Sequence, residues 1–181
     1  MFVGSSIDDA IEQLREQQTE MDSRYDQLDG WKLRKISRGD DNHPIMLVID
    51  ELAYFSATTG DKRTRKTFSL LLRDVIARGR AAGVIVVAAT QRPSADIIPT
   101  SLRDLIGYRL AFRCTTETSS DIVLGHGWHS RGFDASQIGP TTPGVGLLLA
   151  EGGIPRRMRC AYLSDVEISR IAGHPDSGGA A

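Results

Sequence analysis

Two short runs of apolar residues indicate buried strands. Residues 45–49 and 84–89 are each unbroken apolar stretches with polar residues after them. A strand of a parallel sheet is covered on both faces, so its sequence shows such a run and not an alternation of polar and apolar positions. We therefore predict buried strands over residues 45–50 and 84–90. Three further strands are expected over residues 108–114, 146–150 and 156–161.

Helical spacing of apolar residues indicates two long helices. In the first, Ser5 and Ser6 are suited to cap a helix and acidic residues follow in its first turn, so we expect it to begin there and to end near Asp29 and Gly30. The second is expected over residues 64–82, with Gly83 placed to end it. The apolar positions of the first helix are Ile7, Ile11, Leu14, Met21, Tyr25 and Leu28. Shorter helices are expected over residues 100–105, 118–124 and 165–171.

The alternation of strands and helices predicts an α/β layered fold. Loops are expected over residues 32–43 and 56–63, and a hairpin connection over 151–155. With 181 residues the chain fits one domain that buries a sizeable core. We assign this domain to residues 1–172 and expect the tail of small residues at 173–181 to be disordered.

Composition limits the function only weakly. Basic and acidic residues nearly cancel, 22 against 23, so no global positive field indicates a nucleic-acid partner. Cys114 and Cys160 lie in strand-like segments and indicate buried thiols in a reducing compartment. No apolar run approaches the roughly 20 residues that span a bilayer, and the first residues lack the features of a secretory signal. We expect a cytoplasmic chain whose parent protein can carry a membrane anchor elsewhere.

Two adjacent carboxylates end the first apolar run, because Asp50 and Glu51 follow Ile49 directly. The carboxyl ends of strands in an open α/β sheet border the crevice where ligands bind. In nucleotide hydrolases of the P-loop class this is the Walker B position, where one carboxylate holds Mg²⁺ and a neighbouring one can orient the attacking water. Alone, the pattern is equally consistent with a strand that ends in a turn.

A polar string, Thr-Gln-Arg-Pro-Ser at residues 90–94, ends the second apolar run. If the two strands are neighbours, Gln91 lies at the same sheet edge as Asp50 and Glu51. An amide at that place can contact a γ-phosphate or a lytic water. For this string alone, a surface turn stopped by Pro93 is the alternative of equal weight.

Taken together, the two strand ends resemble the FtsK/SpoIIIE family of DNA-translocating motor ATPases. The resemblance rests on Val-Ile-Asp-Glu-Leu-Ala at 48–53, Arg-Ala-Ala-Gly at 80–83 and Ala-Thr-Gln-Arg-Pro-Ser at 89–94. The string Thr-Gln-Arg-Pro-Ser is its most diagnostic piece. The resemblance continues through residues 96–99 and 106–112, and residues 20–25 are similar to the family's helix ahead of Walker B.

The resemblance implies a RecA-like P-loop NTPase sheet with flanking helices, in a motor that forms a hexameric ring around double-stranded DNA and uses ATP and Mg²⁺. By position, Asp50 would coordinate Mg²⁺, Glu51 would activate the attacking water, and Gln91 would sense the γ-phosphate. Arg109 would act as an arginine finger on a neighbouring subunit's ATP. An ordinary strand-end arginine in a salt bridge is the equal alternative for Arg109.

One part of the family's pattern is missing from these residues. The sequence holds no Gly-x-x-x-x-Gly-Lys-[Ser/Thr] string, whose backbone N–H groups cradle the phosphates. We therefore expect the C-terminal half of a motor domain, without the N-terminal P-loop unit, and no ATP hydrolysis by this chain alone. The P-loop would come from a missing N-terminal half or from a P-loop-bearing partner chain. A non-catalytic subunit of an intact motor and a fragment of a type VII secretion-like ATPase stay open as alternatives.

The sequence after residue 125 adds a finer resemblance. Residues 127–134 and 152–159 are similar to FtsK-like transfer proteins of actinobacterial plasmids and integrative elements, which implies DNA transfer or segregation. Two basic clusters and the loop at 56–63 are candidates for DNA contact, with a solvated surface as the alternative. The clusters are Arg156, Arg157 and Arg159, and Lys32, Arg34, Lys35 and Arg38.

Overall fold

A computed structural model describes residues 6–36 and 42–173 of the chain. They divide into two units, Met1–Gly107 and Tyr108–Ala181, and each unit is described by itself. Both units combine helices and strands, as the α/β prediction requires. The assignment of residues 1–172 to one domain stays a prediction, and the predicted disorder at 174–181 lies outside the described residues. No helix in the described part of the chain is long and apolar enough to cross a membrane.

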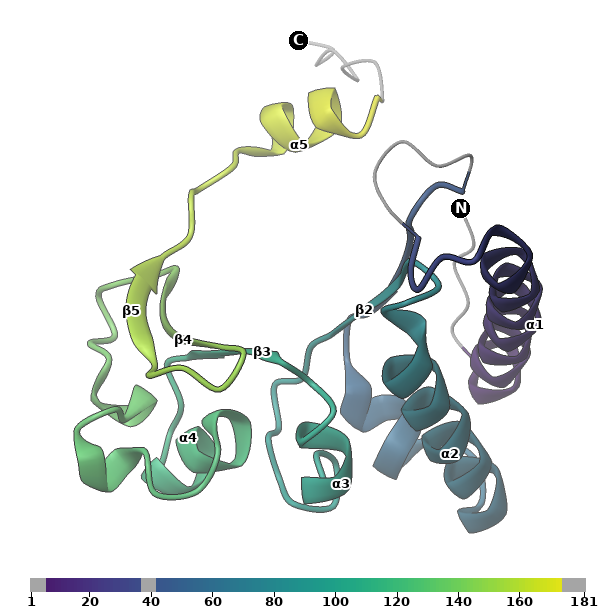
Figure 1. Ribbon diagram of the computed structural model, residues 1–181. Coiled ribbons are helices and arrows are strands. Elements are labelled where there is room, and N and C mark those ends of the chain that lie inside the picture. Colours follow the sequence, from purple (N-terminus) through teal and green to yellow (C-terminus); the bar gives the residue numbers. More distant parts are fainter. Residues whose placement is uncertain (1–5, 37–41, 174–181) are drawn as a thin grey trace, which may run out of the picture. The chain divides into compact units, whose positions relative to one another are not determined.

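The first unit pairs two parallel strands and packs two long helices on the same side of them (Figure 1). The strands β1 and β2 are in register from Ile45 opposite Val84 to Ile49 opposite Ala88. The elements of this unit are α1 (Ile7–Trp31), β1 (Ile45–Ile49), the π-helical turn η1 (Tyr54–Thr58), α2 (Lys62–Gly79), β2 (Val84–Ala88) and α3 (Thr100–Arg103).

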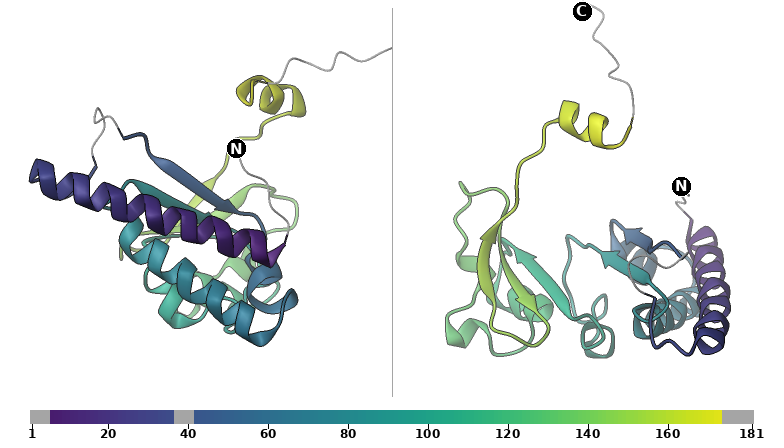
Figure 2. Two further views of the ribbon diagram at one scale, coloured as in Figure 1. Left: turned by 90° about the vertical axis from the view of Figure 1, so that its right-hand side faces the viewer. Right: turned by 45° about the horizontal axis from the view of Figure 1, so that its top comes forward.

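Apolar stripes hold α1 against α2, and the two helices run side by side in Figure 2. Ser6 begins α1 with a capping box, in which its hydroxyl accepts from the Asp9 N–H at 3.0 Å. The buried apolar residues of α1 recur at steps of three, four or seven residues and those of α2 at steps of three and four, so each helix presents one apolar face. Each fully buried side chain of this kind stabilises the fold by about 1.5–3 kcal/mol. The buried apolar residues are Ile7, Ile11, Leu14, Met21 and Leu28 in α1 and Phe68, Leu72 and Val75 in α2.

Polar contacts join α1 to the last turn of α2 and to the turn that follows it. The buried Arg24 donates from Nη1 to the Ala82 carbonyl at 2.9 Å and pairs through Nε with Glu20 at 2.7 Å. The Tyr25 hydroxyl donates to the carbonyl of Arg78 at 2.7 Å. Arg78 itself pairs with Asp22 of α1 at 2.7 Å. The 20–25 segment therefore holds the helix layer in place.

The predicted loop at 56–63 is wrong, because η1 and the start of α2 occupy most of it. Asp61 accepts from the Thr64 N–H at 2.7 Å and so starts α2 two residues earlier than predicted. The helix ends at Gly79, three residues early, and Gly79 lies against the Val84 carbonyl at the start of β2. A Cβ on Gly79 would lie 2.7 Å from that oxygen. Both strands end one or two residues before the predicted limits, and α1 ends at Trp31.

The prediction that both strands are covered on both faces is also wrong for the described residues of the first unit. Leu47 and Val86 contact the helix-covered core, but Met46 and Val48 on the other face are 63% and 62% exposed. The cause is that α1 and α2 both pack on one side. The sequences of β1 and β2 are typical of strands buried on both faces, but only one face of each strand is covered in this unit.

The second unit is an antiparallel sheet in the order β3-β4-β5 with a small core on one face. The predicted hairpin between β4 and β5 is confirmed, and Glu151 and Gly152 both take positive φ (43° and 74°) as a tight hairpin requires. Cys160 is exposed because β5 ends one residue before it, which corrects the expected burial, whereas Cys114 is half-buried. The elements are β3 (Tyr108–Phe112), α4 (Glu117–Leu124), the 3₁₀ turns η2 (His129–Arg131) and η3 (Ala135–Gln137), β4 (Val145–Ala150), β5 (Arg156–Arg159) and α5 (Asp165–Ile171).

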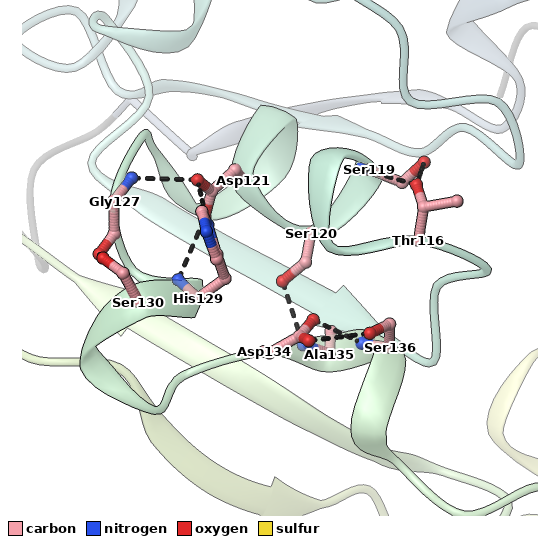
Figure 3. Close-up of polar contacts among 10 residues, drawn as sticks. All are labelled: Thr116, Ser119, Ser120, Asp121, Gly127, His129, Ser130, Asp134, Ala135 and Ser136. Atoms are coloured by element: carbon pink, nitrogen blue, oxygen red, sulfur yellow. Dashed lines mark hydrogen bonds and ion pairs between the residues drawn. The ribbon is translucent and has the colours of Figure 1, made fainter.

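One buried carboxylate, Asp121, holds the loop that follows α4 (Figure 3). Its oxygens accept from the N–H groups of Gly127 at 2.9 Å and His129 at 3.2 Å, and one oxygen lies 2.8 Å from His129 Nδ1. Burial raises the pKa of Asp121, but the hydrogen bonds from Gly127 and His129 outweigh it and leave the pKa lowered. The pKa of His129 is raised, first by its hydrogen bond to Asp121 and further by the charges of Glu117 and Asp134.

We predict that Asp121→Asn lowers the pKa of His129 toward its ordinary value of about 6.5. A raised histidine pKa contributes stability that is fully present below the unfolded value and is lost as pH rises through the folded value. Asp121→Asn should therefore flatten the pH dependence of stability on the alkaline side of about pH 6.5. NMR titration of His129 measures the shift, with Asp134→Asn as the matched control. Equal shifts in the two variants would contradict the role given to Asp121.

Candidate functional site

The carboxyl ends of β1 and β2 lie side by side at one edge of the parallel pair. Hydrogen bonds continue past the strands, since the Ala89 N–H donates to the Ile49 carbonyl and the Leu52 N–H donates to the Ala89 carbonyl, both at 2.8 Å. The residues that follow each strand are therefore neighbours. This edge is where ligands bind in open α/β sheets.

The Glu51 carboxylate joins the two strand ends. Its Oε1 accepts from the Thr90 hydroxyl and, at 3.0 Å, from the Ala53 N–H. Its Oε2 accepts from the backbone N–H of Gln91 at 2.9 Å. Three donors, one from the residues after β1 and two from the residues after β2, thus fix the Glu51 carboxylate. A movement of the segment that holds Gln91 would therefore shift the Glu51 carboxylate, because the two are joined by this hydrogen bond.

These contacts keep Glu51 ionised. Burial raises the pKa of its carboxyl group, but the Thr90 hydroxyl and the N–H groups of Gln91 and Ala53 lower it by more, and the Arg92 charge adds to the lowering. Hydrogen bonds to the charged form of a carboxylate always act in this direction. The net pKa of Glu51 lies below its ordinary value.

Asp50 and Gln91 lie at the same edge with exposed side chains. A carboxylate oxygen is the kind of ligand that Mg²⁺ prefers, and Mg²⁺ usually takes one or two carboxylates together with substrate phosphates. The described residues contain no group of three or more metal-ligating side chains, so Asp50 fits such a shared site and not a closed metal cage. The donor set present therefore fits a phosphate-bound Mg²⁺.

Arg109 belongs to the second unit, so the structure does not group it with the other three predicted site residues. It lies on β3 opposite Leu149 and is half-buried. A Cβ built on Gly125 would lie 3.4 Å from Nη1 of Arg109, so the guanidinium lies against the end of α4. The predicted role of Arg109 as an arginine finger stays a prediction.

Thr90 is the site residue that we did not single out from the sequence. Its hydroxyl donates to Glu51 and accepts from the Arg92 N–H at 3.2 Å. The signal in the sequence was a hydroxyl residue two positions after the end of one strand and a carboxylate two positions after the end of its neighbour. Without the strand register, that pairing was not visible.

We predict that Thr90→Val lowers the free energy of unfolding by about 1–2 kcal/mol near neutral pH, because the volume is kept and the hydrogen bond to a charged group is removed. A lowered carboxyl pKa stabilises the fold above the unfolded value of 4.5 and ceases to do so as pH falls through the folded value. The difference in the free energy of unfolding between the variant and the unaltered chain should therefore become smaller at acidic pH. Urea unfolding at two pH values tests this, with Thr115→Val, at an exposed position, as the control. Equal stability of Thr90→Val and the unaltered chain near neutral pH would be the contrary result.

The chain was compared with family models, with curated proteins and with solved structures. No family model matches it. The chain is 34% identical over 138 residues to "DNA translocase FtsK 2" of Ralstonia nicotianae, which is 75% of this chain and 16% of that protein. It is 31% identical over 132 residues to the DNA translocase FtsK of Mesorhizobium japonicum, with 72% and 13% covered. The chain thus spans about a sixth or less of the length of these relatives.

Solved structures show the same fold at lower identity. The conjugation coupling protein TcpA of pCW3, solved with ATPγS, superposes with a TM-score of 0.74 at 23% identity, over 89% of this chain and 46% of that one. The cytoplasmic domain of the type VII secretion ATPase EccC of Thermomonospora curvata gives 0.68 at 21% identity, over 94% and 20%. These likenesses establish the fold of a P-loop ATPase motor domain, present in part. By its sequence, the chain belongs to the FtsK family of DNA translocases.

Proposed function

We propose that this chain supplies the metal-binding and water-activating half of an ATP site in a DNA-translocating motor. The observation that carries the proposal is the convergence of Asp50, Glu51 and Gln91 at one sheet edge, with Glu51 hydrogen-bonded across to the second strand. Membership of the FtsK family supports ATP as the nucleotide and double-stranded DNA as the cargo.

Each residue has a separate part in the proposed site. Asp50 would hold Mg²⁺ through its exposed carboxylate. Glu51, ionised and with an acceptor position left on Oε2, would orient the attacking water and take its proton. The exposed side chain of Gln91 would contact the γ-phosphate, while its backbone N–H stays bonded to Glu51. When bound, the Mg²⁺–ATP complex supplies the phosphoryl group and the charge that neutralises it.

The phosphate cradle of the proposed site comes from outside these 181 residues. The sequence holds no P-loop string, and a carboxylate without metal repels phosphate. We propose that the cradle is supplied by another segment of the motor, and that a hexameric ring places Arg109 of one subunit at the ATP of the next. Alone, the chain is expected not to hydrolyse ATP. DNA transfer in the cytoplasm is the proposed setting, on the resemblance of the C-terminal residues.

A cluster of cations at the start of α2 is the proposed DNA contact. Lys62, Arg63 and Lys66 are exposed, and the first turn of α2 contains no acidic residue. Among the described residues these three form no ion pair. The helix dipole disfavours cations at this end, so helix stability does not account for them. The cluster directly follows η1, and π-helical turns are frequent at functional sites.

We predict that Glu51→Gln in the complete protein lowers the ATP hydrolysis rate by about 10²–10⁴-fold and leaves ATP binding intact, because the side chain keeps its shape and loses its basicity. Asp50→Ala should weaken Mg²⁺-dependent ATP binding as well. Steady-state hydrolysis and nucleotide binding separate the two effects. Glu12→Gln, at an exposed position of α1, is the matched control. Wild-type turnover by Glu51→Gln would refute its role.

The DNA contact is tested by the salt dependence of binding. Replacing Lys62, Arg63 and Lys66 with alanine in the complete protein should weaken DNA binding for all sequences alike. It should also flatten the slope of log K against log salt concentration by about 0.9 for each phosphate that the variant no longer neutralises. Arg73→Ala, at an exposed position further along α2, serves as control. An unchanged slope in the triple variant would remove the cluster from the DNA interface.

A further inference from the structure

The Thr90 hydroxyl connects three parts of the candidate site. It donates to Oε1 of Glu51 and accepts from the backbone N–H of Arg92 at 3.2 Å. The first bond crosses from the end of β2 to the end of β1, and the second closes a short turn around Gln91. Thr90 therefore holds the carboxylate that follows one strand and shapes the segment that carries the amide after the other. The other two donors to Glu51 are backbone N–H groups, so Thr90 is the donor that a substitution can remove.

The three hydrogen bonds are shared unequally between the two oxygens of Glu51. Oε1 accepts from Thr90 and, at 3.0 Å, from the Ala53 N–H. Oε2 accepts from the Gln91 N–H at 2.9 Å. A carboxylate has about four acceptor positions on its two oxygens. Both positions of Oε1 are thus occupied, and the position that remains for a water is on Oε2.

The hydroxyl of Thr90 sets the direction in which that remaining position points. The torsion that turns the carboxylate of a glutamate is soft, so contacts with neighbours determine the orientation of its plane. Removal of the hydroxyl would leave Oε1 with the Ala53 bond and would open the turn around Gln91. The free position on Oε2 would then no longer be fixed relative to the Gln91 side chain. A small displacement of a reacting group can cost about 10²-fold in rate.

We propose that Thr90 is a positioning residue for ATP hydrolysis, which directs Oε2 of Glu51 toward the attacking water. This inference rests on the proposed function, because it concerns the same water. In that step the water oxygen bonds to the γ-phosphorus, its proton passes to Oε2, and the bond to the oxygen that leaves with ADP breaks. Thr90 takes no proton in this step and acts through Glu51 and Gln91.

Two substitutions in the complete protein isolate the contribution of the hydroxyl. Thr90→Val keeps the volume and removes the hydroxyl, so it should lower kcat by about 10–100-fold and leave the affinity for Mg²⁺–ATP unchanged. Thr90→Ser keeps the hydroxyl and should retain most of the unaltered kcat. Thr115→Val, at an exposed position, is the matched control. An equal loss in Thr90→Ser and Thr90→Val, an unchanged kcat in Thr90→Val, or a loss confined to ATP affinity overturns the proposal.

A double-mutant cycle separates positioning from a loss of stability. Residues that act through one another have non-additive effects on rate. In single-turnover hydrolysis, Thr90→Val should therefore lower the rate of the Glu51→Gln protein little further, although it lowers the rate of the unaltered protein. If Thr90→Val acted only by loosening the fold, it would lower both rates by the same factor, and that result would reject the positioning role. The unfolding midpoint of each variant shows whether the rates belong to folded protein.

The outcome is separable from that of the proposed function. Wild-type hydrolysis by Glu51→Gln would reject the catalytic role of Glu51 itself. Loss of hydrolysis in Glu51→Gln, together with an unchanged rate in Thr90→Val, would keep that role and reject the positioning by Thr90.

Discussion

The hydrogen bonds that the Glu51 carboxylate accepts from Thr90, Gln91 and Ala53 join the ends of the two parallel strands, and the geometry of the candidate site depends on them. They hold an ionised group where solvent reaches only part of it. They also connect the proposed catalytic base to the backbone of the proposed phosphate sensor. A γ-phosphate that moves Gln91 would therefore change the position and basicity of Glu51, which is a direct physical route from nucleotide state to catalysis.

The strands that hold this site are covered on one face only, among the described residues. The stability of the first unit comes from the packing of α1 on α2 and from the contacts of Arg24 and Arg78, all on one side of the strands. The other side presents aliphatic residues to solvent, which is unusual for a parallel sheet. The edge that holds Asp50 and Glu51 is nevertheless fixed by hydrogen bonds within the described residues of the first unit.

Much of the fold was predictable, because buried elements have a clear periodic pattern of apolar residues. The helical stripe of Ile7 to Leu28, the strand cores and the 151–155 hairpin all follow from local periodicity and turn chemistry. The edges of elements were less predictable. Asp61 moves the start of α2 through one side-chain hydrogen bond, and the position of the end of α2 at Gly79 was not marked by a local signal.

The candidate site likewise has features that could be predicted from the sequence and features that could not. Asp50, Glu51 and Gln91 were predictable because each lies within three residues of the end of an apolar strand. The contact of Thr90 with Glu51 could be predicted only from the register of β1 against β2. The contact of Asp121 with His129 depends on the path of a loop whose sequence has no periodicity. The single covered face of the strands was missed for another reason. A hydrophobic run does not show on which of its two faces a strand is covered.

The most direct test of the central claim, that these residues hold only the metal and water half of an ATP site, is calorimetry of the purified chain with ATP and Mg²⁺. Asp50→Ala is measured beside it as the control. The predicted result is no binding by either protein, because the phosphate cradle lies elsewhere. Micromolar binding that Asp50→Ala abolishes would show that the chain builds a cradle of its own, and would contradict the claim.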